Sequence, residues 1–480
     1  MAIERQVPMS GEGSISEGFD GNTILIGGTW SGGEKTFDRF SPADLSNHTG
    51  TFGAANPGQV EAAYTAAADA APGWSGTTAT ERARILFAIA DSLDAHRTDG
   101  ADRLIADIGK ARPDSEAEVG RSAAIFRYFA GELTQPDGET YPSADPSTLL
   151  LTREQPVGVV CAITPWNFPF AIPAWKIAPA IAFGNTLVWK PAEAASGSAV
   201  FICRLLEAAG LPAGVVNLVT GHGRELSDSL TSDPHLRAIT FTGSGGVGTR
   251  LRQAVADRNI KVQLELGGKN PAIVLADADL DVAADQVASG AMLSAGQRCT
   301  ATSRVYIDRP VFEAFRQKLC ERVERMTVGD PGNAKTVVGP VASVAQRDTI
   351  REYIELARNE GATFLSGNEQ PDGDHCFIDP VVLTDVDPES ALVREEIFGP
   401  VAVLQAVDGL DEAITAANDT EFGLSSTIFT NDLTSALEFV NRTESGLVHV
   451  NRETAGVEPH VPFGGIKGSS SQNREQGKAA

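Results

Sequence analysis

The chain has 480 residues and a mass of 50.5 kDa, which is more than one hydrophobic core supports, since typical domains hold about 100 to 200 residues. Two or three domains are therefore expected. The 42% hydrophobic and 21% charged content is ordinary for a globular protein and argues against disorder or a fibrous repeat. The net charge of -24 argues against a nucleic-acid partner, because a phosphate backbone would be repelled over most of the surface.

The acidic balance has two readings. The 63 acidic residues face 39 basic ones, of which only 10 are Lys, a composition that resembles that of salt-adapted cytoplasmic proteins. The alternative is an ordinary acidic surface that favours solubility.

Export, membrane insertion and structural metal are not expected. Residues 1–20 are polar and glycine-rich, without a charged leader followed by an apolar core. The most apolar window, 170–189, is interrupted by prolines, Lys176 and a Gly-Asn pair, so it is a poor membrane span. Five widely spaced cysteines, an odd number, predict neither a disulfide framework nor a zinc site. We therefore expect a cytoplasmic protein.

Periodicity predicts an α/β fold in two parts. Alanine-rich amphipathic helices are expected over 57–71, 80–96 and 115–133, where they cover a first sheet. From residue 157 onward, strands alternate with helices, which predicts parallel α/β architecture; these strands span 157–163, 185–189, 215–219 and 238–241. The alternation restarts after Leu266, and its elements are a strand at 272–275, a helix at 281–292 and a strand at 303–307.

A glycine-rich turn suggests a dinucleotide site. The run Gly-Ser-Gly-Gly-Val-Gly at 243–248 follows the strand at 238–241 and precedes a helix, so a GxGxxG pattern has the right context for helix-start amides to bind a pyrophosphate. A plain tight turn in a chain with 48 glycines explains the pattern equally well. On this fingerprint the ribose acid would be Glu265, 17 residues beyond Gly248.

Two residues are candidates for chemistry. Cys299, in Gly-Gln-Arg-Cys-Thr, lies between a helix and a strand, where a basic neighbour could stabilise a thiolate; a lone cysteine is more often a core residue. Glu265 ends a strand before two glycines and could be a general base, although a solvated strand-end carboxylate is the simpler interpretation.

The motifs taken together resemble the aldehyde dehydrogenase superfamily over nearly the whole chain and in the family's order. Chance occurrence of all seven in this order is negligible. They are Pro-Trp-Asn-Phe-Pro at 165–169, Lys-Pro-Ala-Glu at 190–193, Phe-Thr-Gly-Ser at 241–244, Glu-Leu-Gly-Gly-Lys-Asn-Pro at 265–271, the Cys299 run, Glu-Glu-Ile-Phe-Gly-Pro at 395–400 and Pro-Phe-Gly-Gly at 462–465.

The resemblance implies the following roles. Cys299 is the nucleophile, Glu265 is the general base, Asn167 and the Cys299 amide form the oxyanion hole, and Lys176 helps proton movement near the cysteine. The ribose acid is then Glu193 instead of Glu265. The cofactor-binding set is Trp166, Lys190, Glu193, Gly243, Ser244, Gly248, Glu396 and Phe398.

The cofactor is expected to be NAD or NADP. Gly245 replaces the threonine common after the serine of the cofactor turn, which loosens the turn without removing its amides. Glu193 favours NAD by repelling a 2'-phosphate, whereas Arg224 could offset that repulsion. The choice between the two cofactors stays open.

Within the superfamily, local stretches resemble the 2,5-dioxovalerate (α-ketoglutaric semialdehyde) dehydrogenases of pentose and sugar-acid breakdown. These stretches are Glu-Val-Gly-Arg at 118–121 with Phe-Ala-Gly-Glu at 129–132, the turn at 243–248, Gly-Gln-Arg-Cys-Thr at 296–300, and 454–463 with the tail 467–477. A guanidinium would bind the distal carboxylate of such an aldehyde, and Arg121 and Arg298 are the candidates. The alternative is that Arg121 is a solvated helix residue and Arg298 a salt-bridged one. Phe168, Trp175 and Phe463 would form the apolar wall.

The same resemblance implies a Rossmann-type NAD(P) domain at 1–132 and 153–265, a catalytic α/β domain at 266–467, and an oligomerisation hairpin and bridge at 133–152 and 468–480. A homodimer or homotetramer is expected. The alternatives are another short aldehyde such as succinic semialdehyde or glyceraldehyde, a CoA-acylating enzyme, which Glu265 disfavours, and a non-catalytic binding protein, which the intact Cys299, Glu265 and Asn167 set disfavours.

Overall fold

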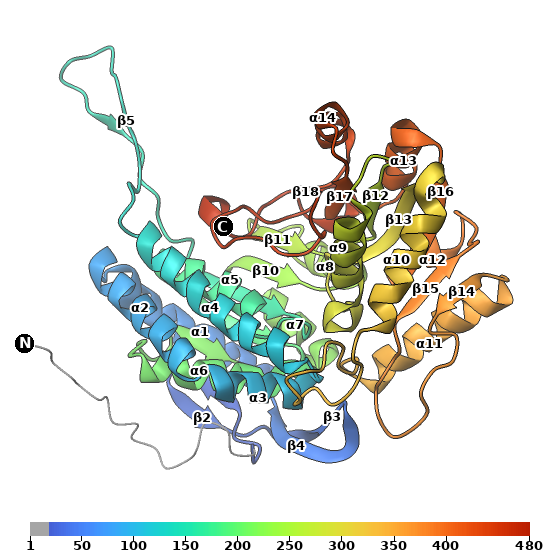
Figure 1. Ribbon diagram of the computed structural model, residues 1–480. Coiled ribbons are helices and arrows are strands. Elements are labelled where there is room, and N and C mark those ends of the chain that lie inside the picture. The colour runs from blue at the N-terminus through green and yellow to red at the C-terminus, as the bar shows by residue number, and fades with distance from the viewer. Residues whose placement is uncertain (1–18) are drawn as a thin grey trace, which may run out of the picture.

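The computed structural model describes residues 19–480, and the expectation for residues 1–20 falls almost wholly outside this range. The chain forms two α/β halves, each built on a seven-stranded sheet, with a thin hairpin that projects from the body (Figure 1). The two sheets are separated in sequence by a four-residue turn between Glu265 and Asn270.

The first sheet contains the strands that the sequence predicts, joined mainly in parallel. Its central strands are buried on both faces, which explains their continuous apolar runs. In spatial order the strands are β11 (Lys261–Glu265), β10 (Leu236–Thr242), β7 (Val159–Thr164), β8 (Thr186–Pro191), β9 (Val216–Leu218), β1 (Ile24–Ile26) and β2 (Thr29–Ser31). Strand β1 is antiparallel to both of its neighbours, β9 and β2.

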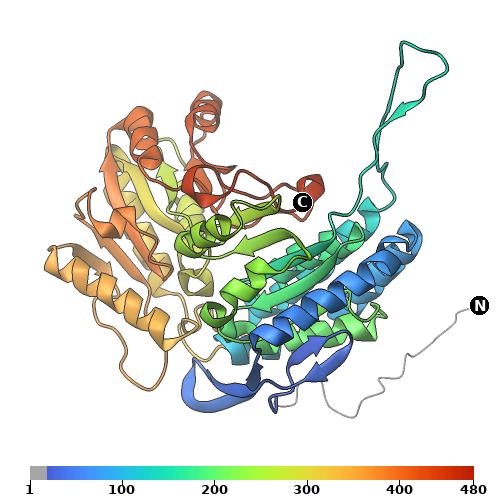
Figure 2. The same cartoon turned by 180° about the vertical axis from the view of Figure 1, so that it is seen from behind.

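Helices cover both faces of this sheet (Figure 2). The first begins at a capping box, in which the Asn56 side chain accepts from Gln59 N and the Gln59 side chain accepts from Asn56 N. The helices are α1 (Pro57–Ser75), α2 (Ala79–Ala95), α3 (Arg97–Ile108), α4 (Arg112–Glu132), α5 (Ala171–Ala182), α6 (Ser196–Ala208), α7 (Gly223–Ser232) and α8 (Gly245–Ala254).

The second sheet is parallel except for one edge strand. Its order is β14 (Thr363–Ser366), β15 (Val381–Thr384), β16 (Val401–Val407), β13 (Thr302–Asp308), β12 (Asn270–Val274), β17 (Ser425–Phe429) and β18 (Leu447–Val450). Its helices are α9 (Leu280–Met292), α10 (Phe312–Glu324), α11 (Val344–Asn359), α12 (Ala391–Arg394), α13 (Gly409–Asn418) and α14 (Leu433–Arg442).

Two hairpins lie outside the sheets. The strands β3 (Lys35–Ser41) and β4 (Asp44–Ala54) form an arm along the base of the molecule, and β5 (Thr140–Tyr141) with β6 (Leu150–Leu151) form the projecting hairpin expected within 133–152 (Figure 1). After β18 the chain runs back between the two halves, where Ser470 bridges Glu265 of β11 in antiparallel fashion. The last segment therefore joins the cofactor sheet to the catalytic half.

The structure also departs from the sequence reading. Strands β1 to β4 precede residue 157, where no strand was predicted, because they are short or have mostly solvent-facing, polar surfaces. Helix α3, also unpredicted, follows α2 after a single residue, His96. Among residues 19–480 no helix has the length and apolarity to cross a bilayer.

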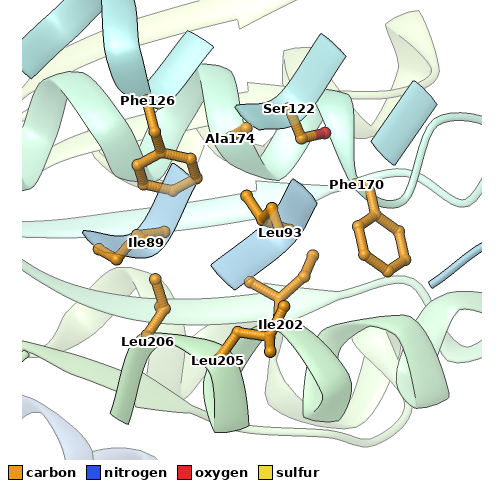
Figure 3. Close-up of a pocket in the computed structure, with 9 residues that line it drawn as sticks. All are labelled: Ile89, Leu93, Ser122, Phe126, Phe170, Ala174, Ile202, Leu205 and Leu206. Carbon is orange, nitrogen blue, oxygen red and sulfur yellow. The ribbon is translucent and has the colours of Figure 1, made fainter. Parts of the chain in front are cut away.

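A small void lies in the core between α2, α4, α5 and α6 (Figure 3). Its volume of about 10 Å³ is too small for a ligand, and apolar side chains such as Phe126 and Phe170 line it. Its one hydroxyl, that of Ser122, donates to the Glu118 carbonyl at 2.9 Å. This void is a packing gap and not a site for a substrate.

Candidate active site

Three predicted catalytic residues meet where the two halves face each other. Glu265 ends β11, Asn167 follows β7, and Cys299 lies between α9 and β13. The Asn167 amide donates to the Gln297 carbonyl at 2.9 Å, which ties the oxyanion-hole candidate to the cysteine loop. The Asn270 amide donates to the Cys299 carbonyl at 2.8 Å, which ties that loop to the start of the second sheet.

The loop before Cys299 has an unusual backbone. Ser294, Ala295 and Gly296 have φ values of 55°, 53° and 67°, a run of left-handed conformations. At Gly296 a β-carbon would lie 2.1 Å from the Gly399 carbonyl oxygen, so only glycine fits. Such strain persists where the surrounding structure holds it, and it is frequent at functional sites.

The Cys299 thiol is half-buried, and its pKa is raised to about 12. Burial is the main cause, and the charges of Glu396, Glu265 and Glu475 add to it, while a hydrogen bond from the Thr300 amide acts in the opposite direction. These causes favour the thiol over the thiolate, and Arg298 is not among the groups that act on it, so attack requires that the thiol proton be removed.

Glu265 is 1% exposed and its pKa is raised well above the usual range. Burial is the largest cause and the charge of Glu475 the next. One carboxylate oxygen accepts from the Ser470 hydroxyl at 3.0 Å, and the other has no partner among residues 19–480. A buried carboxyl with a raised pKa is suited to taking and giving a proton near neutral pH.

Lys176 lies in α5 behind this carboxyl group. Its ammonium group forms a buried ion pair with Glu475 and donates to the Thr240 hydroxyl at 2.9 Å. Glu475 was not among the predicted site residues. The only hint in the sequence was its place in the tail 467–477, because a partner 299 positions away leaves no local pattern.

A buried ion pair supports the oxyanion hole from behind. Lys110 pairs with Glu118, donates to the Asn167 carbonyl at 2.7 Å, and lies 3.7 Å from the centre of the Phe168 ring. Glu118 accepts from the Phe170 and Ala171 amides at 2.8 and 3.2 Å, at the start of α5. Lys110 and Glu118 were not predicted as site residues either.

The cofactor turn has the expected form. Ser244 is the N-cap of α8, and a β-carbon at Gly245 would meet nothing within 4 Å, which leaves the helix start open. Gly248 lets the helix pack on the strands, since a β-carbon there would lie 2.7 Å from Leu266. The Gly243 amide donates to the Glu265 carbonyl at 3.0 Å, so Gly243 acts in the turn itself and not as a free amide.

Glu396 and Phe398, which are predicted to hold the nicotinamide, lie close to Trp166, which is predicted to contact the adenosine. The rings of Trp166 and Phe398 lie 5.4 Å apart and perpendicular. Glu396 accepts from the Gly268 amide at 2.9 Å, and burial raises its pKa to about 7. A cavity of about 640 Å³ runs from α8 past Gly267 and Glu396 to the C-terminal segment. The open helix start and this cavity fit a dinucleotide.

The adenosine side differs from the prediction in one respect. Burial lowers the pKa of Lys190 to about 8, while Glu193 beside it acts in the opposite direction. Glu193 accepts from the Gly223 amide at 3.4 Å and lies 3.0 Å from His222 Nδ1. Arg224 is exposed, and within residues 19–480 it forms no hydrogen bond or ion pair with Glu193 or His222. His222, not Arg224, is the basic neighbour of Glu193.

On the aldehyde side, Trp175 and Phe463 pack at 5.4 Å, and Phe463 belongs to a small cluster with Cys299 and Val457. The Arg121 guanidinium lies over the Trp175 ring at 5.4 Å and donates to the Val457 carbonyl. The Arg121 Nε has no partner within residues 19–480. The structure thus places a half-buried guanidinium beside the apolar wall.

Arg298 has a different environment. Its guanidinium lies 3.6 Å from Asp114 and 3.9 Å from Glu453, and its Nε donates to Ser294 at 3.4 Å. Its charge is therefore already compensated by two carboxylates, as the salt-bridged alternative expects.

Comparison with known proteins agrees with this geometry. The aldehyde dehydrogenase family model matches residues 30–480. The alpha-ketoglutaric semialdehyde dehydrogenase of Bacillus subtilis (strain 168) is 43% identical over 92% of this chain and 91% of its own length. The alpha-ketoglutarate semialdehyde dehydrogenase of Haloferax volcanii is 41% identical over 96% of each.

Solved structures show the same architecture. Betaine aldehyde dehydrogenase from Staphylococcus aureus, in complex with NAD⁺, superposes with a TM-score of 0.92 at 35% identity and covers 96% of this chain and 92% of its own. An NAD-dependent aldehyde dehydrogenase from Sinorhizobium meliloti gives 0.93 at 35% identity, covering 97% and 92%. The chain therefore belongs to the aldehyde dehydrogenase family, as its motifs predict, and is an oxidoreductase that acts on aldehydes with NAD or NADP as the acceptor.

Proposed function

We propose that the enzyme oxidises 2,5-dioxovalerate (α-ketoglutaric semialdehyde) to 2-oxoglutarate, within pentose or sugar-acid degradation. The observation that carries this proposal is Arg121, a half-buried guanidinium whose Nε has no partner among residues 19–480 and which lies beside the Trp175 and Phe463 wall. A substrate carboxylate at the far end from the aldehyde would complete its hydrogen bonding. The names of the B. subtilis and H. volcanii relatives support the same substrate.

The proposed chemistry assigns one task to each residue. Cys299 adds its sulfur to the aldehyde carbon and gives its proton to solvent water. Asn167, which is tied to the cysteine loop through the Gln297 carbonyl, and the Cys299 amide would donate to the resulting oxyanion. A nicotinamide cofactor held by the cavity beside Glu396 would supply the acceptor for the hydride that leaves as the C–O bond becomes a carbonyl. Glu265 then takes a proton from water, whose oxygen attacks the thioester and releases the acid and the Cys299 sulfur.

A substrate panel tests this proposal. We expect the specificity constant for 2,5-dioxovalerate to exceed those for succinic semialdehyde, glyceraldehyde and neutral aldehydes of similar length, measured with both NAD and NADP. A higher specificity constant for another short aldehyde would show that this aldehyde is the substrate, without changing the proposed chemistry. Product that appears only when CoA is added would contradict Glu265 as the activator of water.

The choice of cofactor follows from Glu193. Its carboxylate is placed to accept from ribose hydroxyls and to repel a 2'-phosphate, so we propose NAD as the better acceptor. Arg224 is exposed and not in contact with Glu193, so it offers little compensation. Direct titration of the protein with each cofactor measures the preference.

We further propose a cytoplasmic homodimer or homotetramer, with the domain limits expected from the sequence. The projecting hairpin exposes Leu149 and Leu151 by 74% and 56%. Strand β18 forms the edge of the second sheet, and α14, which also packs on β17, exposes Leu433 by 71%. An apolar hairpin on one subunit and an apolar sheet edge on another are complementary surfaces.

A further inference from the structure

Among residues 19–480, the C-terminal segment provides the one hydrogen bond to the Glu265 carboxylate. Ser470 bridges Glu265 through the backbone, and its Oγ lies 3.0 Å from Glu265 Oε1. The Ser470 backbone is extended, with φ of -157° and ψ of 161°. The pair is buried, so water does not readily take the place of the hydroxyl.

The charged groups around Glu265 act in opposite directions. Glu475 on the same segment opposes ionisation of Glu265, whereas Lys176 of α5 and Arg474 favour it, and the Cys299 thiol feels the charge of Glu265 in turn. Lys176 is itself paired with Glu475. This leaves the Ser470 hydroxyl as the group that stabilises the charged carboxylate by contact.

A hydroxyl has one proton, and here it has two acceptors. Ser470 Oγ is 3.0 Å from Glu265 Oε1 and 3.2 Å from the Asn473 carbonyl oxygen. When Glu265 is ionised, the proton points to the carboxylate. When Glu265 is protonated, its own proton can be donated to Ser470 Oγ while Ser470 donates to Asn473, so both protons keep an acceptor.

We propose that Ser470 is a positioning residue for the general base, whose hydroxyl switches between Glu265 and the Asn473 carbonyl as Glu265 loses and gains the proton of the attacking water. This inference rests on the proposed role of Glu265. The bond to the ionised form is charge-assisted and therefore the stronger of the two, so the hydroxyl lowers the pH at which Glu265 becomes an active base.

Three variants separate positioning from folding. Ser470→Ala removes the hydroxyl, and Ser470→Thr keeps it on an extended backbone that suits threonine. Ser471→Ala is the matched control, because Ser471 bonds only to backbone atoms of β11, the Leu264 amide at 2.9 Å and the Val262 carbonyl at 3.3 Å. Melting temperature and NAD binding verify that each variant is folded.

The measurement is the NADH burst and the steady-state rate as a function of pH. We expect Ser470→Ala to keep the burst amplitude of the parent enzyme. The pH at which the deacylation rate rises should increase by about one unit, and turnover in that pH range should be about 10-fold slower. Ser470→Thr and Ser471→Ala are expected to follow the parent profile.

A Ser470→Ala enzyme with the parent's pH limb and rate would overturn the inference, as would an equal shift in Ser471→Ala. The Glu265→Gln variant shows whether the Ser470 inference alone is wrong or whether the assignment of Glu265 as the general base is also wrong. If Glu265→Gln stalls after the burst while Ser470→Ala behaves as the parent, only the Ser470 inference is wrong. If Glu265→Gln turns over at the parent rate, the base assignment itself is wrong.

Discussion

The Cys299 sulfur lies among three carboxyl groups that oppose its ionisation, and its neighbour Arg298 is already paired with Asp114. Burial and these three carboxyl groups raise the pKa of the thiol to about 12, so removal of its proton has to accompany attack on the aldehyde.

Replacement of Cys299 by Ala is expected to abolish dehydrogenation and leave NAD binding intact, because the sulfur is the only proposed covalent centre. Steady-state assays together with a cofactor titration test this. Turnover above about 1% of the parent would show that another group attacks the aldehyde.

Glu265→Gln is expected to leave hydride transfer and to slow deacylation by about 10²- to 10⁴-fold, the usual range for loss of a general base. Rapid mixing should then show a burst of NADH followed by a slow steady state. Loss of the burst together with turnover would mean that Glu265 acts before the hydride leaves.

Arg121→Ala is expected to lower the specificity constant for 2,5-dioxovalerate about 10- to 100-fold, because one charge-assisted hydrogen bond of about 1.5 to 3 kcal/mol is lost. A neutral aldehyde of similar length should be affected far less. Arg127→Ala on the same helix is the control, since Arg127 binds Asp91 and Asp94 at the surface. An unchanged ratio of acidic to neutral aldehyde activity would remove the carboxylate anchor.

The sequence predicted residues that belong to short motifs, and it missed those that tertiary packing brings in. Cys299, Glu265 and Asn167 meet as expected because each lies in a characteristic run. Ser470 lies 205 residues after Glu265, and its role depends on one hydrogen bond that no spacing reveals. The contact between His222 and Glu193 was not predicted, because it depends on the turn that brings the imidazole to the carboxylate.

At the scale of elements, buried strands were the easiest to predict. Strands β7, β8 and β10 appear within about two residues of the expected limits, because continuous apolar runs are typical of buried parallel strands. Helix α1 continues to Ser75 instead of ending at 71, with Pro72 inside its last turn. The arm β3–β4 escaped prediction because its side chains are mostly polar and exposed.

The hairpin β5–β6 gives a prediction at this scale. Leu149→Asp combined with Leu151→Asp is expected to reduce the particle mass measured by light scattering, because charges would be buried at the proposed contact between subunits. Val344→Asp, which alters an apolar residue on α11 that is 38% exposed, is the control. An unchanged mass in the double variant would place the contact elsewhere.

For the whole molecule the balance of charge predicts a response to salt. Many surface arginines already bridge two acids, as Arg322 does with Asp281 and Asp285, and salt weakens such pairs. The excess of 63 acids over 39 bases leaves a repulsion of 24 charges that those pairs do not neutralise.

We therefore expect the melting temperature to rise between about 0.1 M and molar KCl, where the screening length falls from about 10 Å to about 3 Å. Differential scanning calorimetry measures it, with sucrose as a non-ionic comparison. A flat response, or an equal gain in sucrose, would favour the ordinary acidic surface over salt adaptation.

The return of the chain between the two halves has a consequence for synthesis on the ribosome. The segment that carries Phe463, Ser470 and Glu475 emerges long after the strands that it joins, since Lys176 waits for a partner 299 residues later. A nascent chain can fold its first sheet while its aldehyde pocket still lacks Phe463, which packs on Trp175, and Glu475, the ion-pair partner of Lys176. The aldehyde pocket is thus complete only after residue 475 has left the ribosome, and a chain released before that point lacks this wall and this ion pair.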